Sequence, residues 1–275
     1  MKNKVLVVIC AIIFTVTMLA GCGGNDNPAA NTDASEVGQE DIDKLIIGSK
    51  WMPTEVDGQP MLTNQKLVYN FTSSTTALIS GSSNGNESVI WSPYTEAEVA
   101  ISGNEITITS SPTEHMTIEQ KDSITSINQN EYTAESTGRI ISDGKVVHSS
   151  ETTSSFRFIK VNEDYSEDII GTWEGRCTSE GSVFDDGQDH RWEYREDGTY
   201  IYYMKDGDSW VPSDNTLNEY FVAGNLLCTR WMSSDEENRE WWEITIDTDT
   251  MRWTALRTDE NGETFIASFE MQKVE

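Results

Sequence analysis

Hydrophobic and polar residues alternate along much of the chain after residue 44. Because successive side chains of a strand point to opposite faces, this period of two predicts strands with one buried face. In the first half of the chain the predicted strands are residues 66–72, 97–102, 105–109 and 139–141. In the second half they are residues 190–195, 199–204, 241–247, 251–258 and 264–271. Residues 40–47 form a short predicted helix ahead of the first strands.

Turn dipeptides separate many of these strands. They are Gly103-Asn104, Asp143-Gly144, Asp197-Gly198 and Asn261-Gly262. Such pairs adopt positive φ at little cost, which is what a tight hairpin requires. Strands that recur at short, regular intervals with hairpin turns between them favour a meandering antiparallel sheet, closed as a barrel or stacked as a sandwich.

Two pairs of short sequence matches divide the chain into two similar units. The run LIIGSKW at residues 45–51 is matched by DIIGTW at residues 168–173. At the other end, FRFIKV at residues 156–161 is matched by FEMQKV at residues 269–274. Matches at both ends, in the same order, indicate duplication of one unit. The sequence therefore predicts an all-β protein of two tandem antiparallel meander units, at residues 44–162 and 167–275, each closed as a β-barrel or stacked as a sandwich.

The N-terminal segment has the features of an export signal. Two lysines precede a mostly apolar run at residues 5–19, which is shorter than the roughly 20 residues that a membrane-spanning helix needs. The run ends in LAGC, which resembles the lipobox of bacterial lipoproteins and makes Cys22 the residue that would be lipidated. We therefore expect a signal peptide at residues 1–21 and a lipidated flexible tether at residues 22–43. An ordinary secretory signal with a chance cysteine is the alternative.

The ends of the two units resemble those of lipocalin-like (calycin) domains. The resemblance rests on a Gly-x-Trp at the first strand, meander strands, and a closing Phe-x-[Phe/Met]-x-Lys-Val. The Gly and Trp positions, to which it gives a structural role, are Gly48, Trp51, Gly171 and Trp173. It implies a barrel with a cavity that could hold a small apolar ligand. One extra residue precedes Trp51 in the first unit, so a bulge is expected there.

The resemblance also implies an arginine that lies over each of these two tryptophans and closes the base of the barrel. In the first unit the candidates are Arg139 and Arg157. In the second unit they are Arg252 and Arg257. None of the four stands in a motif that singles it out, so the resemblance leaves the choice open within each unit.

The charge of the chain is strongly negative. It has 19 Lys and Arg against 47 Asp and Glu, a formal net charge of −28 at pH 7. Phosphate backbones repel such a polyanion, so we expect no nucleic-acid partner. With 36% hydrophobic residues and 9 Trp, the chain nevertheless has enough large apolar side chains to build a folded core.

Seven of the nine tryptophans lie in the second unit. If residues 241 and 242 belong to one strand, Trp241 and Trp242 must point to opposite faces. One of the two then lies on the outer surface or against the other unit. The tryptophans either fill the core or form an aromatic platform for a ligand. The candidates for ligand stacking are Trp192, Trp241, Trp242 and Trp253.

No motif for catalysis or metal binding stands out. Cys177 and Cys228 form either a disulfide, which export of the protein favours, or two free thiols. The histidines do not pair with other ligands at metal-binding spacing. The acidic residues at 185–189 and 235–240 are interpreted as a solvated turn and an exposed loop. We therefore expect no catalytic residue, no metal and no cofactor.

Together these features predict a lipid-anchored protein of the cell envelope that binds rather than catalyses. It would be held to a membrane by acyl chains, at the outer membrane if the host is Gram-negative, with its folded part outside the cytoplasm. The expected ligand is small, apolar or glycan-like, and buried against aromatic side chains in a barrel. One alternative is a structural lipoprotein with filled barrels that binds another envelope protein. The other is a glycan-processing enzyme with convergent carboxylates.

Overall fold

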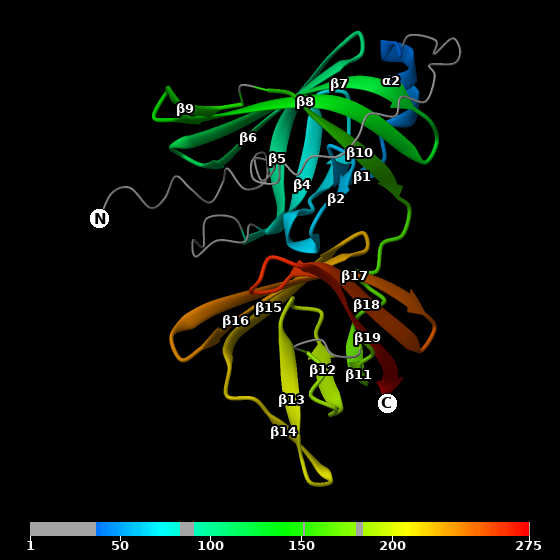
Figure 1. The fold of residues 1–275 in the computed structure, drawn as a ribbon, viewed down its shortest axis with the longest axis vertical. Helices are drawn as coiled ribbons and strands as arrows, with labels where there is room; N and C mark the ends of the chain where they lie inside the picture. The colour runs from blue at the N-terminus through cyan, green and yellow to red at the C-terminus, as the bar shows by residue number, and fades with distance from the viewer. Residues whose placement is uncertain (1–36, 83–90, 151, 180–183, 275) are drawn as a thin grey trace.

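The computed structural model describes residues 37–82, 91–150, 152–179 and 184–274, and these residues build two antiparallel β-sheets (Figure 1). Strands make up 66% of the structure and helix 4%, so the predicted all-β class is confirmed. The predicted signal peptide and lipidation site Cys22 lie outside the described residues. Within the described residues, no helix is both long enough and apolar enough to cross a bilayer.

The first sheet closes into an eight-stranded barrel. Its ring consists of β1 (Lys50–Val56), β3 (Val68–Phe71), β4 (Thr76–Ser82), β5 (Trp91–Ser102), β6 (Glu105–Thr113), β7 (Met116–Ile127), β8 (Glu131–Ser142) and β10 (Ser154–Val161). Consecutive strands of the ring pair as a meander, and β10 pairs with both β8 and β1. The short strands β2 (Gln59–Pro60) and β9 (Lys145–Ser149) pair outside the ring, on β1 and β8.

The second sheet follows the same meander but stays open. Its strands are β11 (Gly171–Cys177), β12 (His190–Tyr194), β13 (Tyr200–Asp206), β14 (Ser209–Pro212), β15 (Thr216–Ala223), β16 (Leu226–Ser233), β17 (Glu236–Asp247), β18 (Thr250–Thr258) and β19 (Thr264–Val274). As in the first sheet, the last strand pairs with the first. At the other side, β14 occupies the edge of β13, and the described residues join β13 to β15 only by the isolated bridge Thr199–Glu219. The sheet is therefore a curled half-barrel with an open side.

The two signature tryptophans occupy equivalent positions in the two sheets. Trp51 pairs in register with Lys160, and Trp173 pairs with Lys273. The lysine ammonium groups lie 6.0 Å from the Trp51 ring centroid and 5.1 Å from that of Trp173. Both tryptophans are fully buried. The cation over each tryptophan is thus the lysine of the closing motif.

The expectation of an arginine over each tryptophan is therefore wrong. The four candidate arginines have other partners: Arg139 binds Glu119, Arg157 binds Glu55 and Glu131, Arg252 binds Glu270, and Arg257 stacks on Trp242. The closing lysine reaches the tryptophan because cross-strand neighbours point to the same face of a sheet.

The extra residue before Trp51 produces no bulge at that tryptophan, which corrects a second expectation. The register shift in β1 lies further on, between Pro53 and Glu55. The additional residue is instead absorbed ahead of the strand. The Trp173 indole N–H donates to the Ile169 carbonyl at 2.7 Å. In the first unit the Trp51 indole N–H donates to the Ser49 hydroxyl at 3.0 Å, which donates to the Ile46 carbonyl at 2.7 Å.

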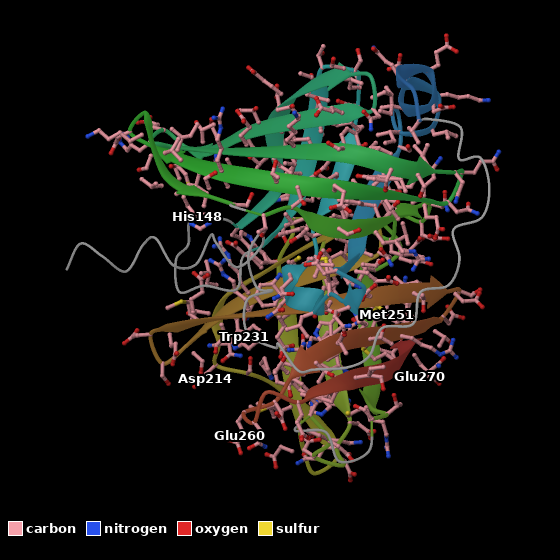
Figure 2. The ribbon with its side chains drawn as sticks, turned by 45° about the horizontal axis from the view of Figure 1, so that its top comes forward. His148, Asp214, Trp231, Met251, Glu260 and Glu270 are labelled. Atoms are coloured by element: carbon pink, nitrogen blue, oxygen red, sulfur yellow. The ribbon has the colours of Figure 1, made fainter. Side chains whose placement is uncertain are left out.

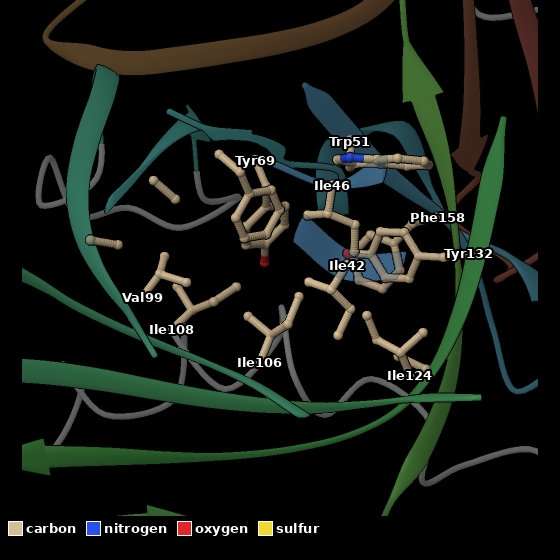
Figure 3. Packing of buried hydrophobic residues seen from close by; sticks show 14 residues of the cluster. Ile42, Ile46, Trp51, Tyr69, Val99, Ile106, Ile108, Ile124, Tyr132 and Phe158 are labelled. Atoms are coloured by element: carbon tan, nitrogen blue, oxygen red, sulfur yellow. The ribbon is translucent and has the colours of Figure 1, made fainter. Parts of the chain in front are cut away.

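The barrel of the first sheet is filled by its own side chains. Helix α2 (Gln39–Leu45) lies at one end of the barrel, and Ile42 and the following Ile46 are fully buried among Trp51, Tyr132 and other core residues (Figure 3). The cavity that remains beside this core has a volume of only about 20 Å³. Because α2 begins at Gln39, regular structure begins ahead of the predicted boundary at residue 44.

A third hydrophobic cluster joins the two sheets. We call it the inter-sheet cluster, and its buried residues are Met52, Val68, Val161, Phe221, Leu226, Cys228 and Trp241. Beside it, the Lys66 ammonium binds the Glu243 carboxylate at 2.7 Å, although Lys66 is only 7% exposed. Thr63, in the 3-10 turn η1 (Thr63–Gln65), accepts a hydrogen bond from the Leu256 backbone N–H at 2.9 Å. Apolar contact and polar contact therefore both connect the barrel to the half-barrel.

Candidate functional site

The concave face of the second sheet contains a cavity of about 310 Å³. Its aromatic wall includes Trp192, Tyr200, Tyr202, Trp242, Trp253 and Phe269. These residues come from five strands, β12, β13, β17, β18 and β19. Because side chains alternate between the two faces of a strand, every second residue of these strands points into the half-barrel. The alternation that predicted the strands thus also explains how the cavity wall is built.

The rings of this wall contact one another at steep angles. The Trp192 and Trp253 centroids are 4.8 Å apart at 55°, and those of Trp242 and Trp253 are 5.3 Å apart at 36°. Phe269 meets Trp192 edge-on, at 5.8 Å and 90°. Edge-to-face packing of this kind is favourable, and it fixes the rings against one another. The wall is therefore a rigid aromatic cluster that presents ring faces in several directions.

One polar side of the cavity is a chain of three hydrogen-bonding side chains. The His190 Nδ1 lies 2.8 Å from the Tyr202 hydroxyl, and its Nε2 lies 3.1 Å from the Asp186 Oδ1. Burial would raise the pKa of Asp186, but the Gln188 backbone N–H and His190 together lower it, so this carboxylate is charged. Burial raises the pKa of Tyr202, so its phenol stays protonated. The chain presents a carboxylate and a hydroxyl to the cavity.

A second carboxylate, Glu240, lies on the cavity wall among the aromatic rings. Its Oε2 accepts a hydrogen bond from the Trp242 indole N–H at 3.1 Å and lies 4.0 Å from the Arg257 guanidinium. Burial raises the pKa of Glu240, and Arg257 and the Trp242 hydrogen bond only partly offset this. The contacts of this carboxylate therefore offset only part of the cost of burying its negative charge. A cation in the cavity would stabilise the charged form further.

Arg257 contacts residues of this wall but does not itself line the cavity. Its guanidinium lies 4.3 Å from the Trp242 ring centroid and 4.7 Å from that of Phe184. Burial lowers the pKa of Arg257, and Glu240 opposes that shift. The cavity wall itself carries two carboxylates, Asp186 and Glu240, and the imidazole of His190.

The cavity is bordered by the open side of the half-barrel. Asn215, between β14 and β15, and Trp231 of β16 belong to its lining. Figure 2 labels Trp231 and the exposed Asp214 next to Asn215 in sequence. Deeper in the wall, the Trp253 indole N–H is buried and has no hydrogen-bond partner among the described residues. A bound molecule with an acceptor atom could satisfy it.

The structure brings together three of the four tryptophans predicted to stack on a ligand. Trp192, Trp242 and Trp253 line the cavity. Trp241 does not, because it belongs to the inter-sheet cluster on the opposite face of β17. The prediction that Trp241 and Trp242 point to opposite faces is confirmed, and the same alternation removes Trp241 from the candidate site.

The two cysteines of the second unit are free, so the favoured disulfide is not formed. Cys228 on β16 is fully buried in the inter-sheet cluster, on the convex face of the half-barrel. Cys177 on β11 packs against the core of the concave face, and its Sγ lies 3.2 Å from the Ser179 hydroxyl. Side chains on opposite faces of one sheet cannot be bridged without moving the backbone.

Sequence reasoning missed the polar residues of the cavity. Asp186 belongs to residues 185–189, interpreted as a solvated turn, and Glu240 to residues 235–240, interpreted as an exposed loop. In the structure Glu240 is within β17 and only 25% of its side chain is exposed. Its spacing of two from Trp242 was the available signal, because residues two apart on a strand share a face.

The comparisons with known proteins leave the chain without an assigned family. No family model matches it, and no curated protein sequence is significantly similar to it. A protein of unknown function of the DUF3598 family from Nostoc punctiforme is 9% identical over 85% of this chain and 97% of that chain, with a TM-score of 0.25. A double mutant of transferrin binding protein B from Haemophilus parasuis is 12% identical over 82% of this chain, with a TM-score of 0.22. The match covers 45% of that protein, and both TM-scores are too low to carry an argument.

Proposed function

We propose that this chain is a lipid-anchored binding protein of the cell envelope that holds a small ligand in the half-barrel of its second sheet. The observation that carries the proposal is the contrast between the two sheets. Among the described residues, the cavity beside the core of the first barrel has about 20 Å³, whereas the half-barrel contains one of about 310 Å³. A hollow of about 240 Å³ on the first sheet has no aromatic lining; polar and charged side chains such as Glu119, Lys121 and Arg139 line it. Small-molecule sites are typically about 300–1,000 Å³, mostly apolar, with a few polar groups.

The chemistry of the cavity favours binding over catalysis. The Tyr202 phenol keeps its proton because burial raises its pKa, so it is a hydrogen-bond donor and not a nucleophile. Aromatic rings surround the polar groups and supply most of the wall. The anchor in this proposal rests on the lipobox at Cys22. The first barrel, filled and packed against the half-barrel, would serve as a rigid support.

Native mass spectrometry of the full-length chain, purified gently from its own host, tests this function. We expect an adduct that is lost on denaturation and whose mass identifies the class of ligand. We further expect Asn215→Trp to abolish the adduct, since an indole at this position on the cavity wall would fill the cavity. Asp214→Trp is the matched control, because it adds the same bulk at the neighbouring exposed residue, which does not line the cavity.

Two results would contradict the proposal. One is a clean apo mass together with no change in tryptophan fluorescence across a panel of lipids, amines and glycans. The other is an adduct that survives Asn215→Trp unchanged, because it would then lie elsewhere in the molecule. The second result would place the ligand outside the half-barrel, and the first would leave the chain as a structural module that binds another envelope protein. The exposed hydrophobic pair Met204 and Val211 of the β13–β14 hairpin would then be the first surface to test.

A further inference from the structure

The charged groups of the cavity wall are unusual for a site that takes an uncharged apolar ligand. Asp186 and Glu240 both line the cavity, and the wall contains no lysine or arginine among the described residues. Among the described residues, the Glu240 carboxylate has a hydrogen bond from the Trp242 indole N–H at 3.1 Å and a long contact to the Arg257 guanidinium at 4.0 Å, both at Oε2. A carboxylate in an apolar wall is costly unless a positive charge or a hydrogen-bond donor meets it.

The arrangement of the rings around these carboxylates fits a cation better than a sugar. A sugar ring stacks flat on one aromatic plane, whereas a compact ammonium group gains from several ring faces that meet at an angle. Trp242 and Phe269 meet at 83°, and Trp192 and Phe269 at 90°. The negative faces of these rings and the two carboxylates therefore both attract a positive charge.

The charge of the whole chain adds to this local effect. With 47 acidic against 19 basic residues, the protein attracts cations from solution and repels anions. Arg257 is stacked on Trp242 and Phe184 and is not part of the lining. His190 is held between Asp186 and Tyr202 and can orient the first of these carboxylates.

From these observations we infer that the half-barrel cavity binds a monovalent organic cation with an apolar body, an amine or a quaternary ammonium compound. The ammonium group lies against the aromatic wall next to Glu240 and Asp186, and the apolar body fills the rest of the cavity. This inference rests on the proposed function and names the ligand class of the same site.

Three probes, two of them of the same size and shape, separate the cation from the alternatives. They are benzyltrimethylammonium, its neutral carbon isostere neopentylbenzene, and chitobiose as a glycan. Binding to the full-length chain is followed by tryptophan fluorescence and by calorimetry at low salt. We expect benzyltrimethylammonium to bind about tenfold more tightly than neopentylbenzene, since only the charge differs between them. We expect chitobiose to bind more weakly than the cation.

The variant Glu240→Gln tests the residue that carries most of the argument. It keeps the size of the side chain and should reduce the affinity for the cation about tenfold while leaving neopentylbenzene binding unchanged. Glu260→Gln is the matched control, because it removes one negative charge in the exposed turn between β18 and β19 and should change neither affinity. Circular dichroism verifies that both variants fold, and the probe comparison on the unmodified chain needs no variant.

Equal affinities for the cation and its isostere would overturn the inference and leave the proposed function standing. So would tighter binding of chitobiose, which would show a glycan site. If none of the three probes binds, the inference is also wrong. The proposed function falls with it only if the native mass of the host-purified chain is free of adducts as well.

Discussion

Asp122 is the most deeply buried carboxyl among the described residues of the first barrel, with 1% of its surface exposed. It accepts hydrogen bonds from the Ser136 hydroxyl at 2.7 Å and from the Gln120 amide at 3.0 Å. Burial raises its pKa to about 6, and these two hydrogen bonds only partly lower it. The barrel is thus filled around a carboxyl that prefers to be protonated.

This shift predicts how stability depends on pH. A carboxyl whose pKa is higher in the folded than in the unfolded chain binds its proton more tightly when the chain is folded. Its contribution to the free energy of unfolding is therefore lost as the pH rises between about 4 and 6. We expect Asp122→Asn, which cannot ionise, to become more stable relative to the parent by about 2 kcal/mol between pH 4 and pH 7. Urea unfolding at several pH values measures the difference.

The control for this prediction has the opposite sign. Hydrogen bonds from backbone N–H groups, the first from Glu263, lower the pKa of the exposed Asp259. The free energy of unfolding of Asp259→Asn should therefore fall relative to that of the parent as the pH rises from acid towards neutral. A difference between Asp122→Asn and the parent that does not change with pH would mean that Asp122 is solvated in the folded chain.

At the scale of single residues, the sequence predicted apolar positions better than polar ones. The signature residues Trp51 and Trp173 are fully buried, as their motif implied. Asp122 and Glu240 could not be placed, because a carboxylate on a strand is outward-facing in the great majority of cases. Only the neighbouring strands decide whether that position faces solvent or a core, and these contacts are remote in sequence.

At the scale of elements, alternation predicted several strands with one solvent face but missed β7 and all of β8 except residues 139–141, and it also missed a strand covered on both faces. The expected hairpin of residues 241–247 and 251–258 is formed by β17 and β18. Strand β16 was missed, since it begins with four buried residues in succession, Leu226 to Thr229. Its concave face contributes to the second core and its convex face to the inter-sheet cluster. Burial on both sides erases the alternation on which the prediction depended.

The turn between β15 and β16 shows how such a strand is fixed against the other sheet. Gly224 has φ +65°, and a Cβ at this position would lie 2.3 Å from Cγ1 of Val161. The Gly224 carbonyl also accepts a hydrogen bond from the Tyr165 backbone N–H at 3.0 Å. Gly224→Ala should therefore destabilise the chain by about 2–4 kcal/mol, from backbone strain together with overpacking.

Gly207, in the turn between β13 and β14, provides the control for this substitution. It has φ +58°, but a Cβ there would meet nothing within 4 Å. Gly207→Ala should cost only the strain of the left-handed backbone, about 1 kcal/mol. Thermal unfolding of both variants gives the comparison. Equal losses would show that the close approach of Gly224 to Val161 has no energetic effect.

At the scale of the whole molecule, the two sheets share one topology and differ in how they are filled. The resemblance predicted two similar barrels, and the meander with its last strand paired to its first is present in both. The open side of the second could not be predicted, because it depends on β14 folding back along β13. That hairpin occupies the edge on which β15 would otherwise pair. A difference of one local hairpin thus separates a filled barrel from a hollow half-barrel.

The ion pair between Lys66 and Glu243 predicts how strongly the two sheets depend on one another. The Lys66 side chain is 9% exposed and that of Glu243 is 24% exposed. Removing only the cation leaves Glu243 poorly solvated, so Lys66→Met should cost about 2 kcal/mol after allowance for the partial exposure of Glu243. Lys66→Met combined with Glu243→Gln should recover most of that loss.

A double-mutant cycle by urea unfolding measures this coupling. Lys121→Met with Glu105→Gln is a comparison pair within the first sheet, because its two side chains are 47% and 38% exposed. Its coupling should be below about 1 kcal/mol. Additive effects of the Lys66 and Glu243 substitutions would mean that apolar contact alone connects the sheets.

Trp241 and Trp242 are adjacent and point to opposite faces of β17, and this arrangement constrains how the sequence can evolve. The first packs between the sheets and the second lines the cavity. Because the two share a stretch of backbone, a new ligand preference cannot be acquired here without risk to the junction between the sheets. Freely varying positions should instead gather on β12 and β13, on the far side of the cavity. Among related sequences, we expect the residues of β12 and β13 that line the cavity to vary and the residues of β17 to be conserved.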